Sequence, residues 1–484
     1  MPIAFDNSYA RLPEHFFSRV DPTPVASPSL LRFNHALAEE MGVTARDFPP
    51  DVLAGNALPE GSEPIALAYA GHQFGGWVPQ LGDGRAVLLG EVVGPDGRRR
   101  DIQLKGSGPT IFSRNGDGRA ALGPAIREYV VSEAMAALGI PTTRALAVVT
   151  TGEKVLRERP LPGAVFTRVA SSHIRVGTFQ YHHAREDPDA LRALTDHVIT
   201  RHYPEAAEKE VPELALLGLL ATRQAELVAQ WMLVGFIHGV MNTDNFSIAG
   251  ETIDYGPCAF VDNFHPGKVF SSIDRHGRYS WGNQPQIAHW NLLQLAQCLI
   301  PLRPDSAEDA REEFEAVLNE FPGTFARAYE QGFARKLGLL DPRPGDLDLA
   351  RDLLTLLADQ EVDFTLFFRR LTTQVESHDE DQSAVHDLFG CAKGFDQWSA
   401  KWQARTSQQD FRDQAQTMRA ANPIFIPRNH RLEEAITAAE QQNFAPFEQL
   451  LEVLSRPFDE QPENAGYENP PQPGEVVHST FCGT

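Results

Sequence analysis

The chain has few cysteines, no long apolar run and no signal-like start. Of its 484 residues only four are cysteine, and no two of them stand at the spacing of zinc ligands. No apolar stretch approaches the ~18 residues that a membrane-spanning helix needs. The opening residues, MPIAFDNSYARLPEHFF, lack the charged-then-apolar order of a secretory signal. We therefore expect a protein of a reducing compartment, the cytoplasm, with no membrane partner.

Basic residues are scarce relative to acidic ones. The 43 Lys and Arg against 65 Asp and Glu give a formal net charge of -22 at pH 7. Such a charge argues against a protein that coats nucleic acid, so we expect no nucleic-acid partner. Any local group of basic side chains is then a candidate for binding phosphate.

Apolar patterning divides the chain into a mixed part and a helical part. AVLLGEVV and DIQLK flank the turn GPDG, which predicts a β-hairpin. GPAIREYVVSEAMAALGI predicts an amphipathic helix, and RALAVVTT and GAVFTRVA predict two further strands. We divide the chain into an N-terminal extension (1–65), a mixed small lobe (66–180), a mainly helical large lobe (181–455) and an extended C-terminal tail (456–484).

The segment HGVMNTDNFSIAGETIDYG, residues 238–256, resembles a kinase catalytic loop with one position changed. Kinases place an Asp two residues after the His, an Asn five residues further on, and then Asp-aromatic-Gly. Here Asn245 and Asp254 stand at the positions of the metal ligands, whereas Val240 stands at the position of the base. Mg2+ on phosphates prefers hard oxygen ligands, so Asn245 and Asp254 are predicted to bind metal. Alternatively, Asn245 caps a turn and Asp254 ends a strand.

Lys105 ends the predicted strand DIQLK, where kinases keep their nucleotide-binding lysine. Its predicted partner on the following helix is Glu128, which is nearer to the helix start than the second candidate, Glu133. The turn LGDGRA precedes this strand and predicts a loop over the nucleotide, and GDGRA recurs at residues 116–120. Glycine admits close backbone approach, and arginine binds phosphate through two hydrogen bonds. Solvated strand ends and ordinary hairpin turns are the alternatives.

Two arginines and one carboxylate are further candidates. Arg168 and Arg175 stand seven residues apart in FTRVASSHIRVG, where both could face one anion or else form surface ion pairs. Asp244 adjoins Asn245 and is the only carboxylate in HGVMNTDN, residues 238–245, so it is a candidate general base, or otherwise a turn former. A disulfide between Cys258 and Cys482 is conceivable, although either thiol could be unreactive.

Histidines outside the loop, such as His72, His182 and His183, have no metal-ligating residues clustered around them in the sequence. We interpret them as packing or turn residues, and we predict no metal site there.

Seven motifs together resemble the selenoprotein O family (the YdiU-like proteins), from about residue 5 to the C-terminus. They are YAGHQFGGWVPQLGDGRA, IQLKGSGPT, SEAMAALGIPTTRAL, SSHIRVG, HGVMNTDN, IDYGPC and NPIFIPRNH. The resemblance implies an α+β, protein-kinase-like two-lobed fold with N- and C-terminal extensions. It also implies transfer of AMP, instead of phosphate, from ATP to Ser, Thr or Tyr hydroxyls of protein substrates. The nucleotide would be reversed relative to its orientation in kinases.

The same resemblance implies a role for each candidate residue. Lys105 would pair with Glu128 and hold phosphates, Arg168 and Arg175 would contact the outer phosphates, and Asp244 would accept the proton. Asn245 and Asp254 would bind Mg2+ or Mn2+. The nucleotide would be lined by Gly82, Gly84, Arg85, Asp117 and Gly118. Cys482 stands where many animal members carry selenocysteine. UMP transfer, a kinase with Asp244 as a displaced base, and a nucleotide-binding pseudokinase scaffold are the open alternatives.

Overall fold

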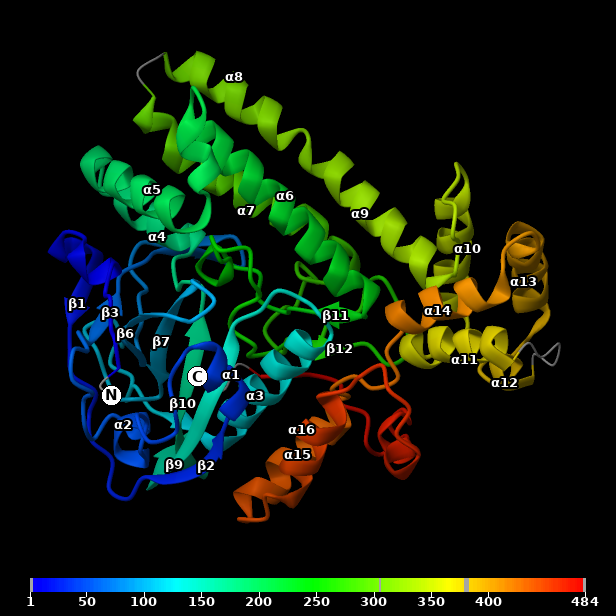
Figure 1. Cartoon of the computed structure of the whole chain (residues 1–484), viewed down its shortest axis with the longest axis horizontal. Helices are drawn as coiled ribbons and strands as arrows, with labels where there is room; N and C mark the ends of the chain where they lie inside the picture. Colours follow the sequence, from blue (N-terminus) through cyan, green and yellow to red (C-terminus); the bar gives the residue numbers. More distant parts are fainter. Residues whose placement is uncertain (1–2, 304–305, 378–382, 482–484) are drawn as a thin grey trace.

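A computed structural model of the chain describes residues 3–303, 306–377 and 383–481. An antiparallel sheet built from residues 17–170 lies beside a larger helical region, so the composition is mixed α/β (Figure 1). No helix among the described residues is long and apolar enough to cross a membrane.

The main sheet has the strand order β1-β3-β6-β7-β10-β9-β2, with β8 paired to β10 off this path. Its strands are β1 Phe17–Arg19, β2 Ser29–Phe33, β3 Ile65–Leu67, β6 Ala86–Val93, β7 Arg99–Lys105, β8 Ala120–Ala121, β9 Arg144–Leu156 and β10 Pro160–Ala170. Two short antiparallel pairs are separate from it: β4 Gly71–Gln73 with β5 Gly76–Val78, and β11 Phe236–Ile237 with β12 Ala259–Phe260. The predicted hairpin is confirmed as β6–β7, and the two further strands as β9 and β10.

Helices provide most of the remaining structure. Those nearest the sheet are α1 His35–Glu40, α2 Pro50–Ala54, α3 Leu122–Ala137, α4 Val176–His183 and α5 Pro188–His202. The others are α6 Pro212–Leu233, α7 Gln284–Leu299, α8 Ala307–Leu318, α9 Phe321–Lys336, α10 Asp346–Asp359, α11 Phe364–Ser377, α12 Ser383–His386, α13 Lys393–Thr406, α14 Phe411–Ala421, α15 Asn429–Glu440 and α16 Ala445–Leu454. The predicted amphipathic helix is confirmed as α3, which ends just before Gly139, a residue in the left-handed region.

Alternation along β7 gives the sheet one apolar face and one partly polar face. Ile102 and Leu104 pack into a core that α1 and α2 cover. Asp101, Gln103 and Lys105 point to the other face, which α3 covers through its contacts with β9 and β10. Charged side chains of β7 are therefore directed at the side of the sheet where the helical region lies.

Both ends of the chain contact the body of the fold. The first 65 residues supply β1 and β2, which are the two edge strands of the sheet. Near the other end, Thr480 pairs with Ser271, and its hydroxyl donates to the carbonyl oxygen of Pro257 at 2.6 Å. The tail thus returns to the loop between β11 and β12.

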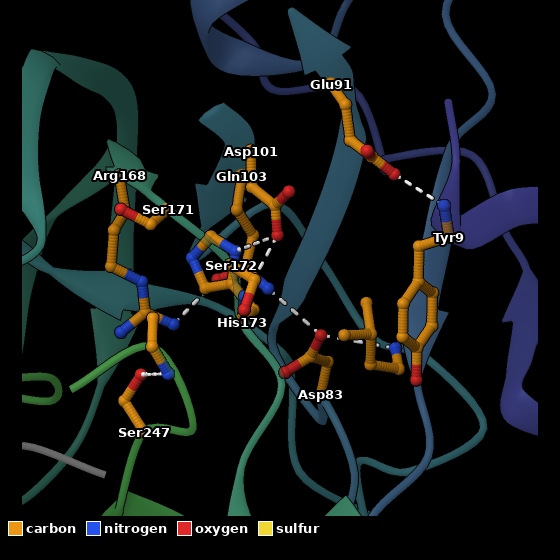
Figure 2. Close-up of polar contacts among 12 residues, drawn as sticks. Tyr9, Asp83, Glu91, Asp101, Gln103, Arg168, Ser171, Ser172, His173 and Ser247 are labelled. Atoms are coloured by element: carbon orange, nitrogen blue, oxygen red, sulfur yellow. Dashed lines mark hydrogen bonds and ion pairs between the residues drawn. The ribbon is translucent and has the colours of Figure 1, made fainter. Parts of the chain in front are cut away.

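A buried ion network joins α5 to the polar face of the sheet. Arg201 of α5 contacts Glu91 of β6 and Asp101 of β7, and these three side chains are at most 4% exposed. Asp101 also accepts hydrogen bonds from the backbone N–H and the ring of His173, as Figure 2 shows. Glu91 accepts a further bond from the backbone N–H of Tyr9 at 2.6 Å. Arg201 therefore joins two buried carboxylates that come from adjacent strands, and Glu91 has a second cation in Arg99 at 3.2 Å.

Replacing Arg201 with methionine should lower the free energy of unfolding by about 3–5 kcal/mol, because the buried Asp101 loses its arginine partner and Glu91 keeps only the contact with Arg99. Urea denaturation followed by circular dichroism measures this loss. The matched control is Arg311→Met on an exposed position of α8, which should change stability by at most about 0.5 kcal/mol. Equal stability of the two variants would contradict the role given to the network.

Candidate active site

A cavity of about 920 Å3 is lined by the two glycine turns, β7, α3, β10 and the loop between β11 and β12. Every residue predicted to bind nucleotide or metal or to act as the base lies in its wall: Gly82, Gly84, Arg85, Lys105, Asp117, Gly118, Glu128, Arg168, Arg175, Asp244, Asn245 and Asp254. Segments that are far apart in the chain thus meet around one space.

Asp254 is the centre of the charged groups in this cavity. Its carboxylate contacts the Nζ atom of Lys105 at 3.2 Å and the guanidinium of Arg168 at 2.6 Å, and it also accepts a hydrogen bond from Arg175. Burial tends to raise the pKa of Asp254, but the charges of Arg175, Arg168 and Lys105 outweigh burial and hold this pKa well below its ordinary value. The carboxylate is therefore ionised throughout the neutral range.

Glu128 is the second anion of this group. Its carboxylate contacts Lys105 at 2.5 Å and Arg168 at 3.3 Å, and its side chain is 6% exposed. Glu133, the other candidate on α3, pairs instead with Arg144 of β9 at 2.8 Å. Three cationic side chains thus meet two carboxylates, which leaves one positive charge in excess.

Strand register determines where Arg168 lies. Arg168 of β10 is opposite Gln103 of β7, one alternation away from Lys105, so both cations are on the same face. The guanidinium donates to the Oε1 atom of Gln103 at 2.6 Å, and Gln103 donates in turn to the carboxylate of Asp83 at 3.0 Å. Figure 2 shows Gln103 between Arg168 and Asp83. Arg168 is therefore fixed from two sides and is 1% exposed.

Arg175 is held by backbone pairing with the loop. Residues on either side of it, Ile174 and Val176, exchange backbone hydrogen bonds with Ile248 and Phe246. The guanidinium of Arg175 also donates to the backbone carbonyl of Asp244 at 2.6 Å. The loop and Arg175 consequently form one rigid unit facing Asp254.

Asp244 has one carboxylate oxygen bonded and the other without a partner. Oδ2 accepts from Nε2 of Gln73 at 3.2 Å, and Oδ1 is buried with no hydrogen-bond partner among the described residues. Burial raises the pKa of Asp244 to about 6, against the opposing effect of the hydrogen bond from Gln73. An oxygen with this pKa and a vacant lone pair is suited to accept a proton near neutral pH.

Asn245 and His238 shape the rest of the loop. Nδ2 of Asn245 donates to the carbonyl of Val240 at 3.0 Å, which leaves the amide oxygen as a ligand atom. His238 contacts the carbonyl of Ile253 at 2.9 Å, directly before Asp254. Val240 itself is buried and lines the cavity, so an apolar side chain occupies the position at which kinases have their catalytic base.

Both glycine turns depend on the absence of a side chain. A Cβ on Gly82 would lie 2.3 Å from the ring of Phe112, and one on Gly118 would lie 2.1 Å from the carbonyl of Gly108. Both residues have positive φ angles, 88° and 66°. Between Gly82 and Gly84, the buried Asp83 accepts from the backbone N–H of Leu67 at 3.1 Å and anchors the turn. The backbone of each turn can therefore approach a ligand closely.

Asp117, like Glu128 and Asp254, has a cationic partner for its carboxylate. Arg157 contacts it at 2.8 Å, and this hydrogen bond lowers the pKa of Asp117 below its ordinary value. Nothing in the turn RER, residues 157–159, predicted this pair. Gln73 was likewise missed, although it belongs to the motif YAGHQFGGW, which carried part of the family resemblance.

Neither predicted redox cysteine is a described part of the cavity wall. Cys258 is buried, with 1% of its surface exposed. Cys482 lies outside the described residues.

The expectation that nothing clusters around His182 is wrong. Ring nitrogens of His15 and His182 and a carboxylate oxygen of Asp187, all atoms that can bind a metal ion, lie within 4.8 Å of one another. His15 contacts Asp187 at 3.5 Å. The packing interpretation of His182 is confirmed, because its ring is buried 4.1 Å from that of Phe16. The distant partner, His15, lies in the η2 turn at residues 14–16, and its contact with Asp187 cannot be predicted from sequence spacing.

Comparison with known proteins adds independent findings. The family model described as "Protein adenylyltransferase SelO" matches residues 1–455. Proteins named "Protein nucleotidyltransferase YdiU" from Methylorubrum extorquens, a Bradyrhizobium species and Rhodopseudomonas palustris are 61%, 59% and 58% identical to this chain. Each alignment covers 99% of this chain and 99% of the relative. The chain therefore belongs to the SelO family of protein adenylyltransferases.

Proposed function

We propose that this protein transfers AMP from ATP to the hydroxyl of Ser, Thr or Tyr in protein substrates, with release of pyrophosphate. The observation that carries the proposal is the charge pattern of the cavity. Two arginines join the Lys105–Glu128 pair around Asp254, where they leave one positive charge in excess. A buried excess charge is costly unless an anion enters, so the cavity favours a polyphosphate.

The leaving group explains the need for these arginines. The acceptor oxygen attacks the α-phosphorus, the bond from that phosphorus to the bridging oxygen breaks, and pyrophosphate takes the electron pair. Negative charge then accumulates on the outer phosphates, where Arg168, Arg175 and Lys105 would stabilise it. Pre-positioned cations need no reorganisation at that moment, and Gln103 and the loop backbone hold both arginines in place.

Asp244 would take the proton of the acceptor hydroxyl. Its Oδ1 has no hydrogen-bond partner in the part of the chain that the structure describes, and Val240 offers no alternative base at the kinase position. Gln73, held on Oδ2, would orient the carboxylate so that Oδ1 meets the acceptor.

The donor set of Asn245 and Asp254 fits a hard divalent cation, because it offers an amide oxygen and a carboxylate on one cavity wall. We propose Mg2+ or Mn2+, which when bound would offset phosphate charge. Asp254 would then lose part of its ion pairing with Arg168 and Arg175 and would bind the cation instead. The two arginines would form ion pairs with the phosphates.

We further propose that the sheet region and the helical region act as the small and large lobes of a kinase-like fold. Residues 66–180 would form the small lobe and 181–455 the large lobe, with 1–65 and 456–484 as extensions. The cytoplasm, where ATP is abundant, is the proposed setting.

The direct test is a pair of labelled nucleotides offered with a mixture of candidate protein substrates. ATP labelled on the α-phosphate should transfer label to protein, and ATP labelled on the γ-phosphate should not. Asp254→Ala should abolish transfer because the cation ligand and the charged centre of the site are lost. Label from γ-ATP alone would indicate a kinase, and label from neither nucleotide, with ATP still bound, would indicate a scaffold. Preferential labelling from α-labelled UTP would replace AMP with UMP in the proposal.

Activity should depend on the ionisation of Asp244. Its pKa of about 6 means that the carboxyl is protonated below that pH and cannot accept a proton. We therefore expect kcat/KM to fall as pH decreases through about 6. Asp244→Asn should reduce kcat by about 10²–10⁴-fold and remove this acid limb. A wild-type profile that is flat between pH 5 and 7.5 would exclude Asp244 as the base.

The tail suggests redox control of the same site. Thr480 is fixed against Pro257, which directly precedes Cys258, and Cys482 is two residues beyond Thr480. We propose that a two-electron oxidant, a peroxide or a small-molecule disulfide, takes two electrons and two protons from the thiols of Cys258 and Cys482 and leaves them joined as a disulfide. Mass spectrometry of oxidised protein should detect the linked peptides, and oxidation should change the activity of wild type but not of Cys482→Ser. Unlinked cysteines with equal activity in both states would refute this proposal.

A further inference from the structure

A second cavity, of about 610 Å3, adjoins the first. Phe74 and Ile273 line both cavities, so the two spaces are adjacent. The remaining wall comes from the segment 274–278 and from α7, including Trp290. None of these residues is used by the nucleotide chemistry described above.

The hairpin β4–β5 connects this cavity to Asp244. At its tip, the backbone N–H of Phe74 donates to the side chain of Asn242 at 3.0 Å, and the neighbouring Gln73 contacts Asp244. On its other side, the hairpin turn approaches Arg278: a Cβ on Gly75 would lie 3.6 Å from the guanidinium carbon. A chain lying in the second cavity would therefore lead directly to the proposed base.

The charge of this cavity is opposite to that of the whole protein. Arg275, His276 and Arg278 line it, within a chain whose formal net charge is -22. Asp274 is the one acidic residue in its wall, but it is buried and its carboxylate accepts the backbone N–H groups of Arg278 and Tyr279. The available charge facing the cavity is thus positive.

Neither arginine has a carboxylate partner among the described residues. The guanidinium of Arg278 lies 4.8 Å from the ring of Trp290, and its buried Nε has no hydrogen-bond partner there. Arg275 is exposed, as is Ile273, which is 57% accessible. Arg275 is exposed and Arg278 is half-buried, so both cations on this cavity wall are open to an acidic ligand.

We propose that the second cavity holds the acceptor segment of the protein substrate and selects acidic residues beside the acceptor hydroxyl. This proposal rests on the proposed function and adds the substrate class to it. An extended segment would place its hydroxyl at Asp244, a neighbouring Asp or Glu on Arg275 and Arg278, and an apolar side chain against Phe74, Ile273 and Trp290. Charge complementarity of this kind governs partner choice and association rate.

The test uses three fluorescent peptides of equal length that differ only in the residues around one central Ser: Glu, Gln or Lys. Binding is measured by fluorescence anisotropy, and transfer is measured with α-labelled ATP. Wild type should bind and modify the Glu peptide at least about tenfold better than the Lys peptide. In Arg275→Glu/Arg278→Glu this order should be reversed, with unchanged affinity for ATP. Arg311→Glu on α8 is the matched charge control and should behave as wild type.

The two readouts separate this proposal from the proposed function. Acid-selective binding that the double variant loses supports the docking proposal even if no peptide receives label. The absence of label would then count against the proposed nucleotide transfer, and not against the docking cavity. Equal binding of all three peptides by wild type, or the same preference in wild type and the double variant, would overturn the docking proposal whether or not AMP is transferred.

Discussion

The site depends on the contact of one carboxylate, Asp254, with three cations. Lys105, Arg168 and Arg175 come from β7, from β10 and from the segment after β10, and of the described residues only Asp254 forms an ion pair with all three. Asp254 has a positive φ of 65°, an uncommon conformation for a residue other than glycine, and such strain persists where surrounding contacts require it. The charges in the cavity are thus organised around an acid that the loop holds in a costly conformation.

The sheet provides the rigidity that this arrangement needs. Alternation along β7 directs Asp101, Gln103 and Lys105 to one face, and each serves a different purpose. Asp101 is tied to α5 through Arg201, Gln103 links Arg168 to Asp83 in the first glycine turn, and Lys105 reaches Asp254. A single strand therefore connects the structural network, the first glycine turn and the charged centre.

Local patterns predicted a large part of this. The alternation of AVLLGEVV and DIQLK gives β6 and β7, and the spacing of Asn245 and Asp254 after His238 marks the loop. Contacts between distant segments could not be predicted from such local patterns. Gln73 reaches Asp244 across 171 positions, and His15 reaches Asp187 only because η2 packs against α4. Spacing also could not reveal that Asp117 is paired with Arg157, because that pairing depends on how the second glycine turn lies against the end of β9.

On metal binding, Asp254 would exchange cationic side chains for the metal ion, and the arginines would move to the outer phosphates. Anomalous X-ray scattering from Mn2+, in crystals grown with a non-transferable ATP analogue, tests this exchange. We expect a manganese peak bound by Asn245 and Asp254, the α-phosphate nearest to Asp244, and Arg168 and Arg175 on the β- and γ-phosphates. A γ-phosphate nearest to Asp244, or manganese bound away from Asp254, would contradict it.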